Sequence, residues 1–289
     1  MSNTSFDLTG KLPAEQLELL ACLQAAANRL SLPLLLVGAT VRDLFLHHLY
    51  GKRIRRATYD LDLTVQTDTW PQFQELRQSL LDSGKFKPSR YQQQLYWQEG
   101  ARTKVDLVPF GGLEAPPGQI TWPGEDFVMS TTGFSEVLAH AVALRLEANL
   151  VLQAASLEGL ALLKIVSWGD RPQERRRDAQ DLDWLLDEYL DITQDEQLFS
   201  EQAAHADLLD EDFDSLTAGA RMMGRNIGNI ASAATRQTLL AILAAGNQRS
   251  GITVLANTAE QLRSRFASSE QALVRWRELL RGIRESETA

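Results

Sequence analysis

Residues 58–65 of the chain read Thr-Tyr-Asp-Leu-Asp-Leu-Thr-Val, and this alternation of polar and apolar side chains predicts a β-strand. Asp60 and Asp62 would point to one face of that strand, about 6.5–7 Å apart, and the aliphatic residues to the other. Two like charges on one face repel each other unless a cation lies between them, and Mg²⁺ suits carboxylate oxygens. A D-x-D pair by itself is equally compatible with a solvated edge strand.

The segments on either side of this strand favour a site over a solvated edge. Upstream, the apolar residues 33–37 predict a buried strand that runs into Gly38-Ala39-Thr40 and then a helix over 40–50. Backbone N–H groups at such a turn favour phosphate binding, although a plain tight turn is the commoner meaning of the pattern. Downstream, a strand expected over 103–110 carries Asp106 among apolar residues, and Asp106 would complete a cluster of three carboxylates.

The hydrophobic pattern changes at about residue 155, where strand-like alternation ends and helical periods begin. The expected fold class is therefore α+β, with a mixed β-sheet and helices in residues 1–155 and an all-helical domain in residues 156–289. The other expected elements are helices over 14–30 and 71–83, a strand over 91–98, a hairpin over 142–154, and helices over 157–168, 174–190, 212–228, 234–245, 254–266 and 269–283.

The composition of the 289 residues is that of a globular protein, with 44% hydrophobic and 23% charged residues. The chain has no apolar run of roughly 18 residues, which excludes a membrane-spanning helix, and its N-terminus does not resemble a secretory signal. The single cysteine, Cys22, cannot form an internal disulfide. We therefore expect a cytoplasmic protein. A net charge of −9 argues against a non-specific coat for nucleic acid, but it leaves room for one local basic patch.

The order of glycine turn, helix, acidic pair and third acid resembles the nucleotidyltransferase superfamily typified by DNA polymerase β. Further segments extend the resemblance to the AbiEii/AbiGii family, whose studied members include toxins of toxin–antitoxin systems. The combination is specific, although each segment alone is loose, and it covers about residues 32–186. The segments are Val37-Gly38-Ala39-Thr40-Val41-Arg42-Asp43, Arg56-Ala57-Thr58-Tyr59-Asp60-Leu61-Asp62, Val105-Asp106-Leu107-Val108-Pro109-Phe110-Gly111, Leu160-Ala161-Leu162-Leu163-Lys164, Asp170-Arg171 and Arg176-Arg177-Asp178-Ala179-Gln180-Asp181-Leu182.

This resemblance implies a role for each matching residue. Asp60 and Asp62 would hold Mg²⁺, or Mn²⁺ in its place, together with the nucleoside triphosphate that is the co-substrate. Asp106 would be the third metal ligand and the base for the acceptor hydroxyl. Lys164 would reach the triphosphate from the second domain, which would close the active-site cleft. The other residues assigned to nucleotide binding are Gly38, Thr40, Arg42, Arg177, Asp178 and Asp181.

One motif departs from the family, because its first glycine is usually followed by Gly or Ser and here the chain reads Gly38-Ala39-Thr40. The hydroxyl that contacts phosphate is therefore left open. The assignment of Lys164 agrees with its setting, since a lysine in the apolar helix 157–168 must either extend to water or meet an anion. The basic loop of Lys52, Arg53, Arg55 and Arg56 would steer a triphosphate or RNA to the site, or would be simply solvated.

The expected reaction is in-line transfer of a nucleoside monophosphate from the triphosphate to an acceptor hydroxyl, with release of pyrophosphate. The leading acceptor is the 3′ end of tRNA, in a toxin that has a cognate antitoxin protein as partner. The alternatives are a small-molecule or protein acceptor, and a non-catalytic module that binds a nucleotide or an antitoxin. Alanine at Asp60, Asp62 or Lys164 is expected to abolish transfer and to leave the chain folded.

Overall fold

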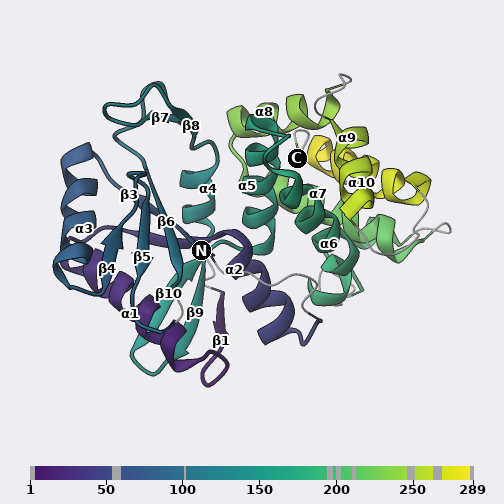
Figure 1. The fold of residues 1–289 in the computed structure, drawn as a ribbon. Helices are drawn as coiled ribbons and strands as arrows, with labels where there is room; N and C mark the ends of the chain where they lie inside the picture. The colour runs from purple at the N-terminus through teal and green to yellow at the C-terminus, as the bar shows by residue number, and fades with distance from the viewer. Residues whose placement is uncertain are drawn as a thin grey trace. The chain divides into compact units, whose positions relative to one another are not determined.

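A computed structural model describes most of the chain. The chain divides into two compact units, Met1–Ser156 and Leu157–Ala289 (Figure 1). The first unit contains the β-sheet and the second contains helices alone among its described residues. The residues that the structure describes are 4–53, 60–100, 102–193, 198–199, 203–209, 213–245, 251–262 and 269–286.

The described part of the first unit holds one mixed eight-stranded sheet and a separate two-stranded ribbon. In spatial order the sheet consists of β1 (Ser5–Asp7), β9 (Val142–Glu147), β10 (Leu150–Ala154), β2 (Leu34–Val37), β3 (Asp60–Gln66), β6 (Lys104–Phe110), β5 (Gln94–Trp97) and β4 (Phe86–Pro88). The ribbon consists of β7 (Gln119–Thr121) and β8 (Val128–Ser130). Because β2, β3 and β6 lie in the middle of the sheet, their neighbours on both sides satisfy their backbone hydrogen-bonding groups.

The alternation expected in β3 is confirmed, since Leu61, Leu63 and Val65 are all buried.

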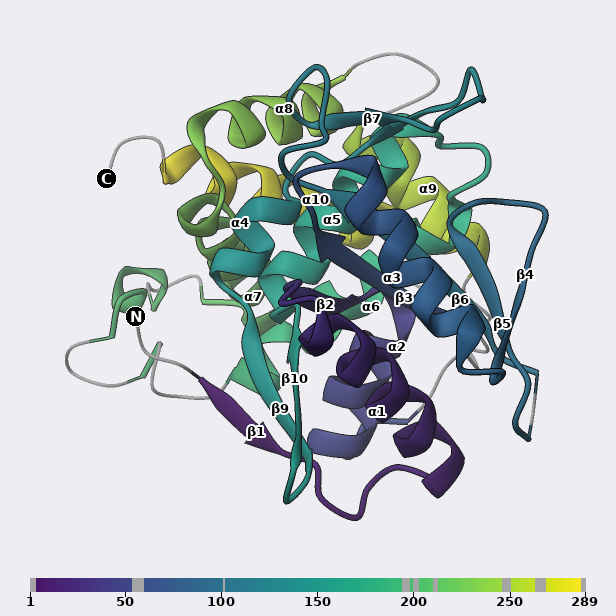
Figure 2. The ribbon, with the colours of Figure 1, turned by 90° about the vertical axis from the view of Figure 1, so that its left-hand side faces the viewer.

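Helices α1 (Ala14–Arg29) and α3 (Trp70–Asp82) lie in front of the sheet in Figure 2 and pack against each other. The start of α3 is fixed by a capping box, in which Thr69 and Gln72 bond each other's backbone N–H groups, and by Pro71 in the first turn. The sequence therefore predicted this helix to within one residue at each end.

The structure differs from the expected elements where segments are short. The expected helix over 40–50 is α2 (Gly38–Asp43), and its chain continues as a wider π-helical stretch, Leu44–Leu49. The turn-rich sequence between about residues 111 and 133 contains β7 and β8, which have three residues each and pair with each other. Strands β1 and β4 are equally short. Three residues are too few to establish a period, so the alternation that predicted β3 could not reveal them.

The helices of the second unit follow the predicted order, and the expected helix over 254–266 extends beyond the described residues. Among the described helices of the whole chain, none is both long and apolar enough to cross a membrane. The bounds are α5 (Leu157–Asp170), α6 (Arg176–Thr193), a 3₁₀ turn (Ala206–Leu208), α7 (Ser215–Ile230), α8 (Ala233–Ala244), α9 (Ile252–Leu262) and α10 (Ser269–Glu285), while the first unit adds the short α4 (Phe134–Ala139).

Helices α7 and α10 approach each other through glycines. The backbone of Gly224 on α7 faces the backbone of α10 so closely that a Cβ added there would lie 3.0 Å from the Cα of Gly282. Gly282 faces α7 in the same way, with the amide nitrogen of Arg225 2.8 Å from where its Cβ would be. A side chain at either position must push the two helices apart, because the obstacle is backbone and cannot rotate away.

We expect Gly224→Ala to lower the free energy of unfolding by about 1–3 kcal/mol, the usual cost of overpacking a close-packed contact, even though alanine is the better helix former. Urea unfolding followed by circular dichroism measures this change. Asn229→Ala is the matched control, because Asn229 lies on the same helix and is exposed. A Gly224→Ala protein as stable as the control would contradict the close approach of the two backbones.

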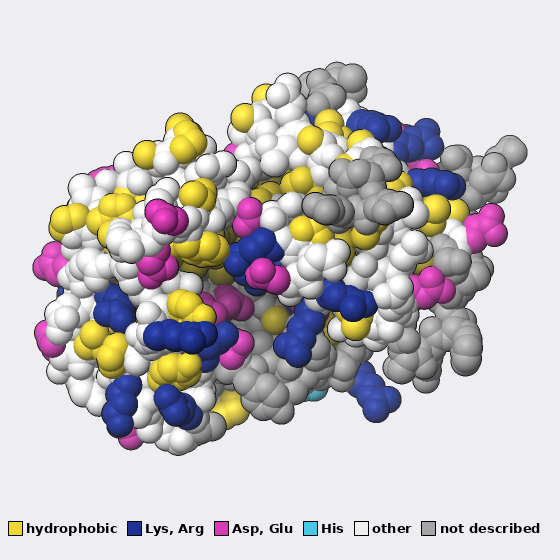
Figure 3. Space-filling model, turned by 45° about the horizontal axis from the view of Figure 1, so that its top comes forward, with side chains coloured by type: hydrophobic (Ala, Val, Ile, Leu, Met, Phe, Trp, Pro, Cys, Tyr) yellow, Lys and Arg dark blue, Asp and Glu magenta, His cyan; other side chains and the backbone are white. Residues whose placement is uncertain are grey.

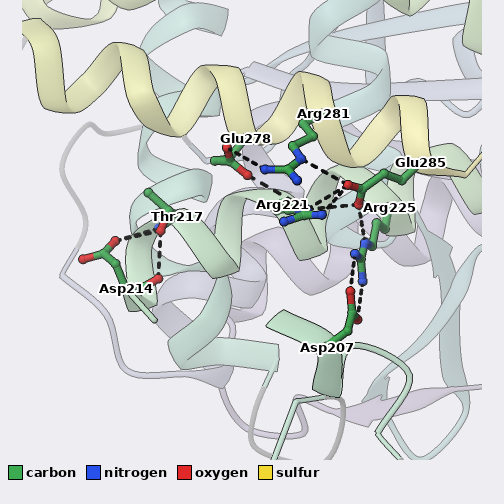
Figure 4. Close-up of polar contacts among 8 residues, drawn as sticks. All are labelled: Asp207, Asp214, Thr217, Arg221, Arg225, Glu278, Arg281 and Glu285. Carbon is green, nitrogen blue, oxygen red and sulfur yellow. Dashed lines mark hydrogen bonds and ion pairs between the residues drawn. The ribbon is translucent and has the colours of Figure 1, made fainter. Parts of the chain in front are cut away.

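Charged side chains also join α7 and α10, as Figure 4 shows. Arg221 and Arg225 both donate to the carboxylate of Glu285, with nitrogen–oxygen distances of 3.0 and 2.7 Å, and Arg225 also donates to both oxygens of Asp207. The hydrogen bonds from Arg225 lower the pKa of Asp207. Burial by itself would raise the pKa of Glu285, but the bonds from the two arginines outweigh it and the pKa is lowered. These ion pairs therefore favour the folded state while the carboxylates are charged.

We expect acid to remove this stabilisation. Since the pKa values of Asp207 and Glu285 are lower in the folded protein than their ordinary 3.8 and 4.5, the contribution is complete above those values. It is lost as the pH falls through the lowered values. In Arg225→Met, urea midpoints should therefore fall less steeply than in the wild type as the pH decreases below about 5. Arg284→Met removes the same charge from an exposed site on α10 and should keep the wild-type slope.

Candidate active site

Three of the predicted acids lie on one face of the sheet in the first unit. Strands β3 and β6 run parallel, and their register places Asp62 directly opposite Asp106 and Asp60 directly opposite Lys104. Directly opposite residues in a sheet point to the same face, with Cβ atoms about 4.5–5.5 Å apart. The side chain of Asp60 is half exposed and that of Asp106 is 21% exposed. The sequence predicted that each strand carries an acid, and the sheet topology brings these acids together.

Lys104 joins this cluster, and sequence reasoning missed it as a site residue. Its ammonium nitrogen lies 2.9 Å from Oδ2 of Asp60 and 3.2 Å from Oδ2 of Asp106. The lysine thus places a positive charge between two carboxylates that would otherwise repel each other. The sequence did hold a signal, because Lys104 is two residues before Asp106 on the same strand and must share its face. That it meets Asp60 depends on the register, which the sequence did not reveal.

Asp106 has the setting of a proton acceptor. Burial raises the pKa of its carboxyl group, and the nearby Lys104 ammonium only partly opposes that effect. One oxygen, Oδ1, is buried and has no hydrogen-bond partner in the part of the chain that the structure describes. A buried carboxylate oxygen without a partner is costly, so this atom is suited to receive a cation or a hydroxyl proton.

The donor set can be compared with what a divalent ion requires. Asp60, Asp62 and Asp106 supply carboxylate oxygens, which are the ligands that Mg²⁺ and Mn²⁺ favour. As the side chains lie, no group of three His, Cys, Asp or Glu residues within the described ranges is close enough to hold a metal ion. The ammonium of Lys104 is instead the cation between Asp60 and Asp106. The residues therefore fit a metal in chemistry and charge, with Lys104 as the competing cation.

The glycine turn lies against the acidic pair. Gly38 has a φ of +74°, and a Cβ there would lie 2.7 Å from the Cβ of Asp62, so only glycine fits. Thr40 is buried, and its hydroxyl donates to the backbone carbonyl of Asp60 at 3.1 Å, which fastens the turn to β3. Arg42 is fully buried, and its guanidinium bonds the carboxylate of the adjacent Asp43. The turn is thus built around Asp60 and Asp62.

The expected basic loop is described only in part. Lys52 is half-buried and Arg53 is exposed. Arg55 and Arg56 lie outside the described residues, as do Thr58 and Tyr59 at the expected start of the strand. The steering role suggested for this loop therefore stays a prediction.

The predicted residues of the second unit form a buried ion cluster. Lys164 on α5 lies 2.9 Å from Oδ1 of Asp178 and 2.7 Å from Oδ2 of Asp181, both on α6. Burial alone would lower the pKa of Lys164, but the two carboxylates outweigh burial and raise it, so the lysine is charged. Arg177 is exposed. The lysine in the apolar helix thus contacts anions, as its setting required, and they are two acids of the same chain that were expected to bind the nucleotide.

Removal of Lys164 would leave Asp178 and Asp181 without their cation in a site where the lysine side chain is only 7% exposed. We therefore expect Lys164→Met to lower the free energy of unfolding by about 3–5 kcal/mol, as for a broken buried ion pair. This prediction adds a cost in stability to the expectation that alanine at Lys164 abolishes transfer and leaves the chain folded. Urea unfolding measures the cost, and Lys164→Met combined with Asp181→Asn should recover part of it. Wild-type stability in Lys164→Met would disprove the buried pair.

The first unit has a mixed sheet with acids on adjacent strands and a glycine turn beside them, and a helical unit follows. These features define a nucleotidyltransferase, and comparison with protein families agrees. The family described as "Nucleotidyl transferase AbiEii toxin, Type IV TA system" matches residues 19–285. The chain therefore belongs to the AbiEii family, as its motifs indicated.

Solved structures similar to the chain show low sequence identity. The antibiotic-resistance factor ANT(2'')-Ia is 17% identical, with a TM-score of 0.36, over 60% of this chain and 90% of its own. An antigenic nucleotidyltransferase-like protein from Paracoccidioides brasiliensis is 18% identical, with a TM-score of 0.39, over 60% and 75%. The CCA-adding enzyme of Thermotoga maritima is 14% identical, with a TM-score of 0.30, over 97% and 72%. No curated protein matches the chain.

Proposed function

We propose that this nucleotidyltransferase moves a nucleoside monophosphate from a nucleoside triphosphate to the hydroxyl at the 3′ end of tRNA, with a divalent metal ion. The observation that carries the proposal is the register of β3 and β6, which sets Asp62 beside Asp106 and places a cation next to both Asp60 and Asp106. Carboxylates gathered around a positive charge are costly to maintain for structure alone, because their mutual repulsion opposes folding.

Each residue of the cluster has a proposed part in the reaction. Asp60, Asp62 and Asp106 hold Mg²⁺ or Mn²⁺, which when bound polarises phosphate oxygens and neutralises their charge. Asp106 accepts the proton of the acceptor hydroxyl, and its raised pKa makes it a better base than an ordinary aspartate. Because Gly38 has no side chain, the Asp62 side chain packs directly against the turn, and its carboxylate lies beside the backbone to which the triphosphate is proposed to bind.

The proposed setting is that of a toxin–antitoxin pair. The family to which the chain belongs is described as the toxin of type IV systems, so a cognate antitoxin protein is the expected counterpart. Nucleoside triphosphates and tRNA occur together in the cytoplasm, where we propose that the protein acts. The resemblance assigns Lys164 and Arg177 to triphosphate binding, and within the second unit Asp178 and Asp181 hold the lysine.

The test is incubation of the purified protein with Mg²⁺, each α-³²P-labelled nucleoside triphosphate in turn, and total tRNA. We expect label on the tRNA and pyrophosphate in solution. Asp62→Asn should reduce the rate at least about a hundredfold, because it removes one of the carboxylates proposed to hold the divalent metal ion. Asp82→Asn is the matched control, since Asp82 is an exposed acid of the same unit and should keep wild-type activity.

The other outcomes distinguish the alternatives. Label on a small molecule or a protein, but not on tRNA, would show that the acceptor is not tRNA and would support the proposed nucleotidyl transfer. Binding of triphosphate without pyrophosphate release from any acceptor supplied would favour the non-catalytic module. Transfer by Asp62→Asn at the wild-type rate would disprove the role of the carboxylate cluster.

A further inference from the structure

The face of the sheet that carries the acids continues outward over two more strands. In β5, Gln94 lies opposite Asp106 and Tyr96 lies opposite Lys104, and in β4, Lys87 lies opposite Tyr96. These residues therefore share the face of the carboxylates. Neighbouring strands are about 4.8 Å apart, so this extension reaches roughly 10 Å beyond Asp106, to the edge of the sheet.

Aromatic rings and guanidinium groups stack on this part of the first unit. The guanidinium carbon of Arg102 lies 4.3 Å from the ring centre of Tyr96, and that of Arg90 lies 4.5 Å from the ring centre of Tyr91. Arg102, Arg90 and Tyr91 are exposed, and Tyr96 is half-buried. Figure 3 shows Lys and Arg side chains beside side chains of the hydrophobic class, in which Tyr is included, at the lower left of the view.

The local charge is opposite to that of the whole chain. Residues 85–104 contain five Lys or Arg residues and one acid, Glu99, whereas the chain as a whole has a net charge of −9. Lys85 is paired with Glu18 at 2.6 Å, so it adds little to the surface. The four other basic residues are Lys87 and Arg90 on the β4–β5 hairpin, Arg102 between β5 and β6, and Lys104 next to the acids.

We propose that this aromatic–cationic surface, made of Lys87, Arg90, Tyr91, Tyr96 and Arg102, binds the single-stranded end of the acceptor RNA. The inference rests on the proposed function, because it takes the acceptor to be RNA. Aromatic rings stack with bases of any sequence, and a guanidinium lying flat on a ring still presents its N–H edges to phosphate. The surface leads from the sheet edge to Asp106, so a strand lying along it brings its terminal hydroxyl to the proposed base.

The test is fluorescence anisotropy with a 5′-fluorescein-labelled 12-nucleotide single-stranded RNA that has the 3′-terminal sequence of tRNA. EDTA is present and nucleoside triphosphate is absent, so that the measurement does not depend on catalysis. We expect Tyr96→Ala to weaken binding about tenfold and Tyr96→Phe to keep it, because phenylalanine retains the ring. Arg102→Ala should weaken binding. It should also reduce the slope of the logarithm of the binding constant against the logarithm of the salt concentration by about 0.7 in magnitude.

The control is Arg145→Ala, which removes an exposed arginine from β9, three strands from β3 in the sheet order, and should bind RNA as the wild type does. Wild-type binding by Tyr96→Ala and Arg102→Ala would overturn the inference and leave transfer to tRNA intact. If the wild type binds no RNA and labels a small molecule instead, the result would disprove both the RNA-binding surface and the proposal that the acceptor is RNA. Unchanged melting temperatures of Arg102→Ala and Tyr96→Phe show that the variants are folded.

Discussion

The parallel pairing of β3 and β6 places Asp62 directly opposite Asp106, where two like charges repel each other, and places Asp60 directly opposite Lys104, with which it forms an ion pair. The pairing lies in the middle of the sheet, so neither strand can shift register to relieve the charge without exposing its buried aliphatic face. The ammonium of Lys104 is the compensation that the chain itself provides. A divalent ion would place more positive charge beside the same oxygens. The lysine and a metal ion are therefore alternative cations that can reduce the repulsion between these carboxylates.

The sequence predicted those features of the site that depend on hydrophobic periodicity and on the spacing of residues along the chain. Alternation along 58–65 identified both faces of β3, and one acid among apolar residues identified Asp106 as its companion. The register between two strands far apart in the chain is a tertiary property, and for that reason the pairing of Lys104 with Asp60 was missed. The hydroxyl of Thr40 was open for the same reason, since its direction toward the Asp60 carbonyl depends on where the turn meets β3.

The second unit shows a different limit. Its helices were predicted because helical periods persist over many residues. The packing of α7 on α10 depends on two glycines, Gly224 and Gly282, and hydrophobic periodicity does not reveal such a contact. The resemblance named Lys164, Asp178 and Asp181 as nucleotide-binding residues but did not predict that they pair with one another. The structure joins them in a buried ion cluster, so the same residues stabilise the second unit. A stability measurement must therefore accompany each activity measurement at this lysine.

The acidity of the chain is itself unevenly distributed, and this matters for an RNA acceptor. Residues 178–220 contain 14 Asp or Glu residues and no Lys or Arg, so the net charge of −9 arises from this one segment of the second unit. The rest of the chain carries more basic than acidic residues, and the surface of β4 and β5 is basic beside the carboxylates. A polyanion that approaches the protein is therefore repelled by one segment and attracted by another, and this difference favours binding along the strand edge that leads to Asp106.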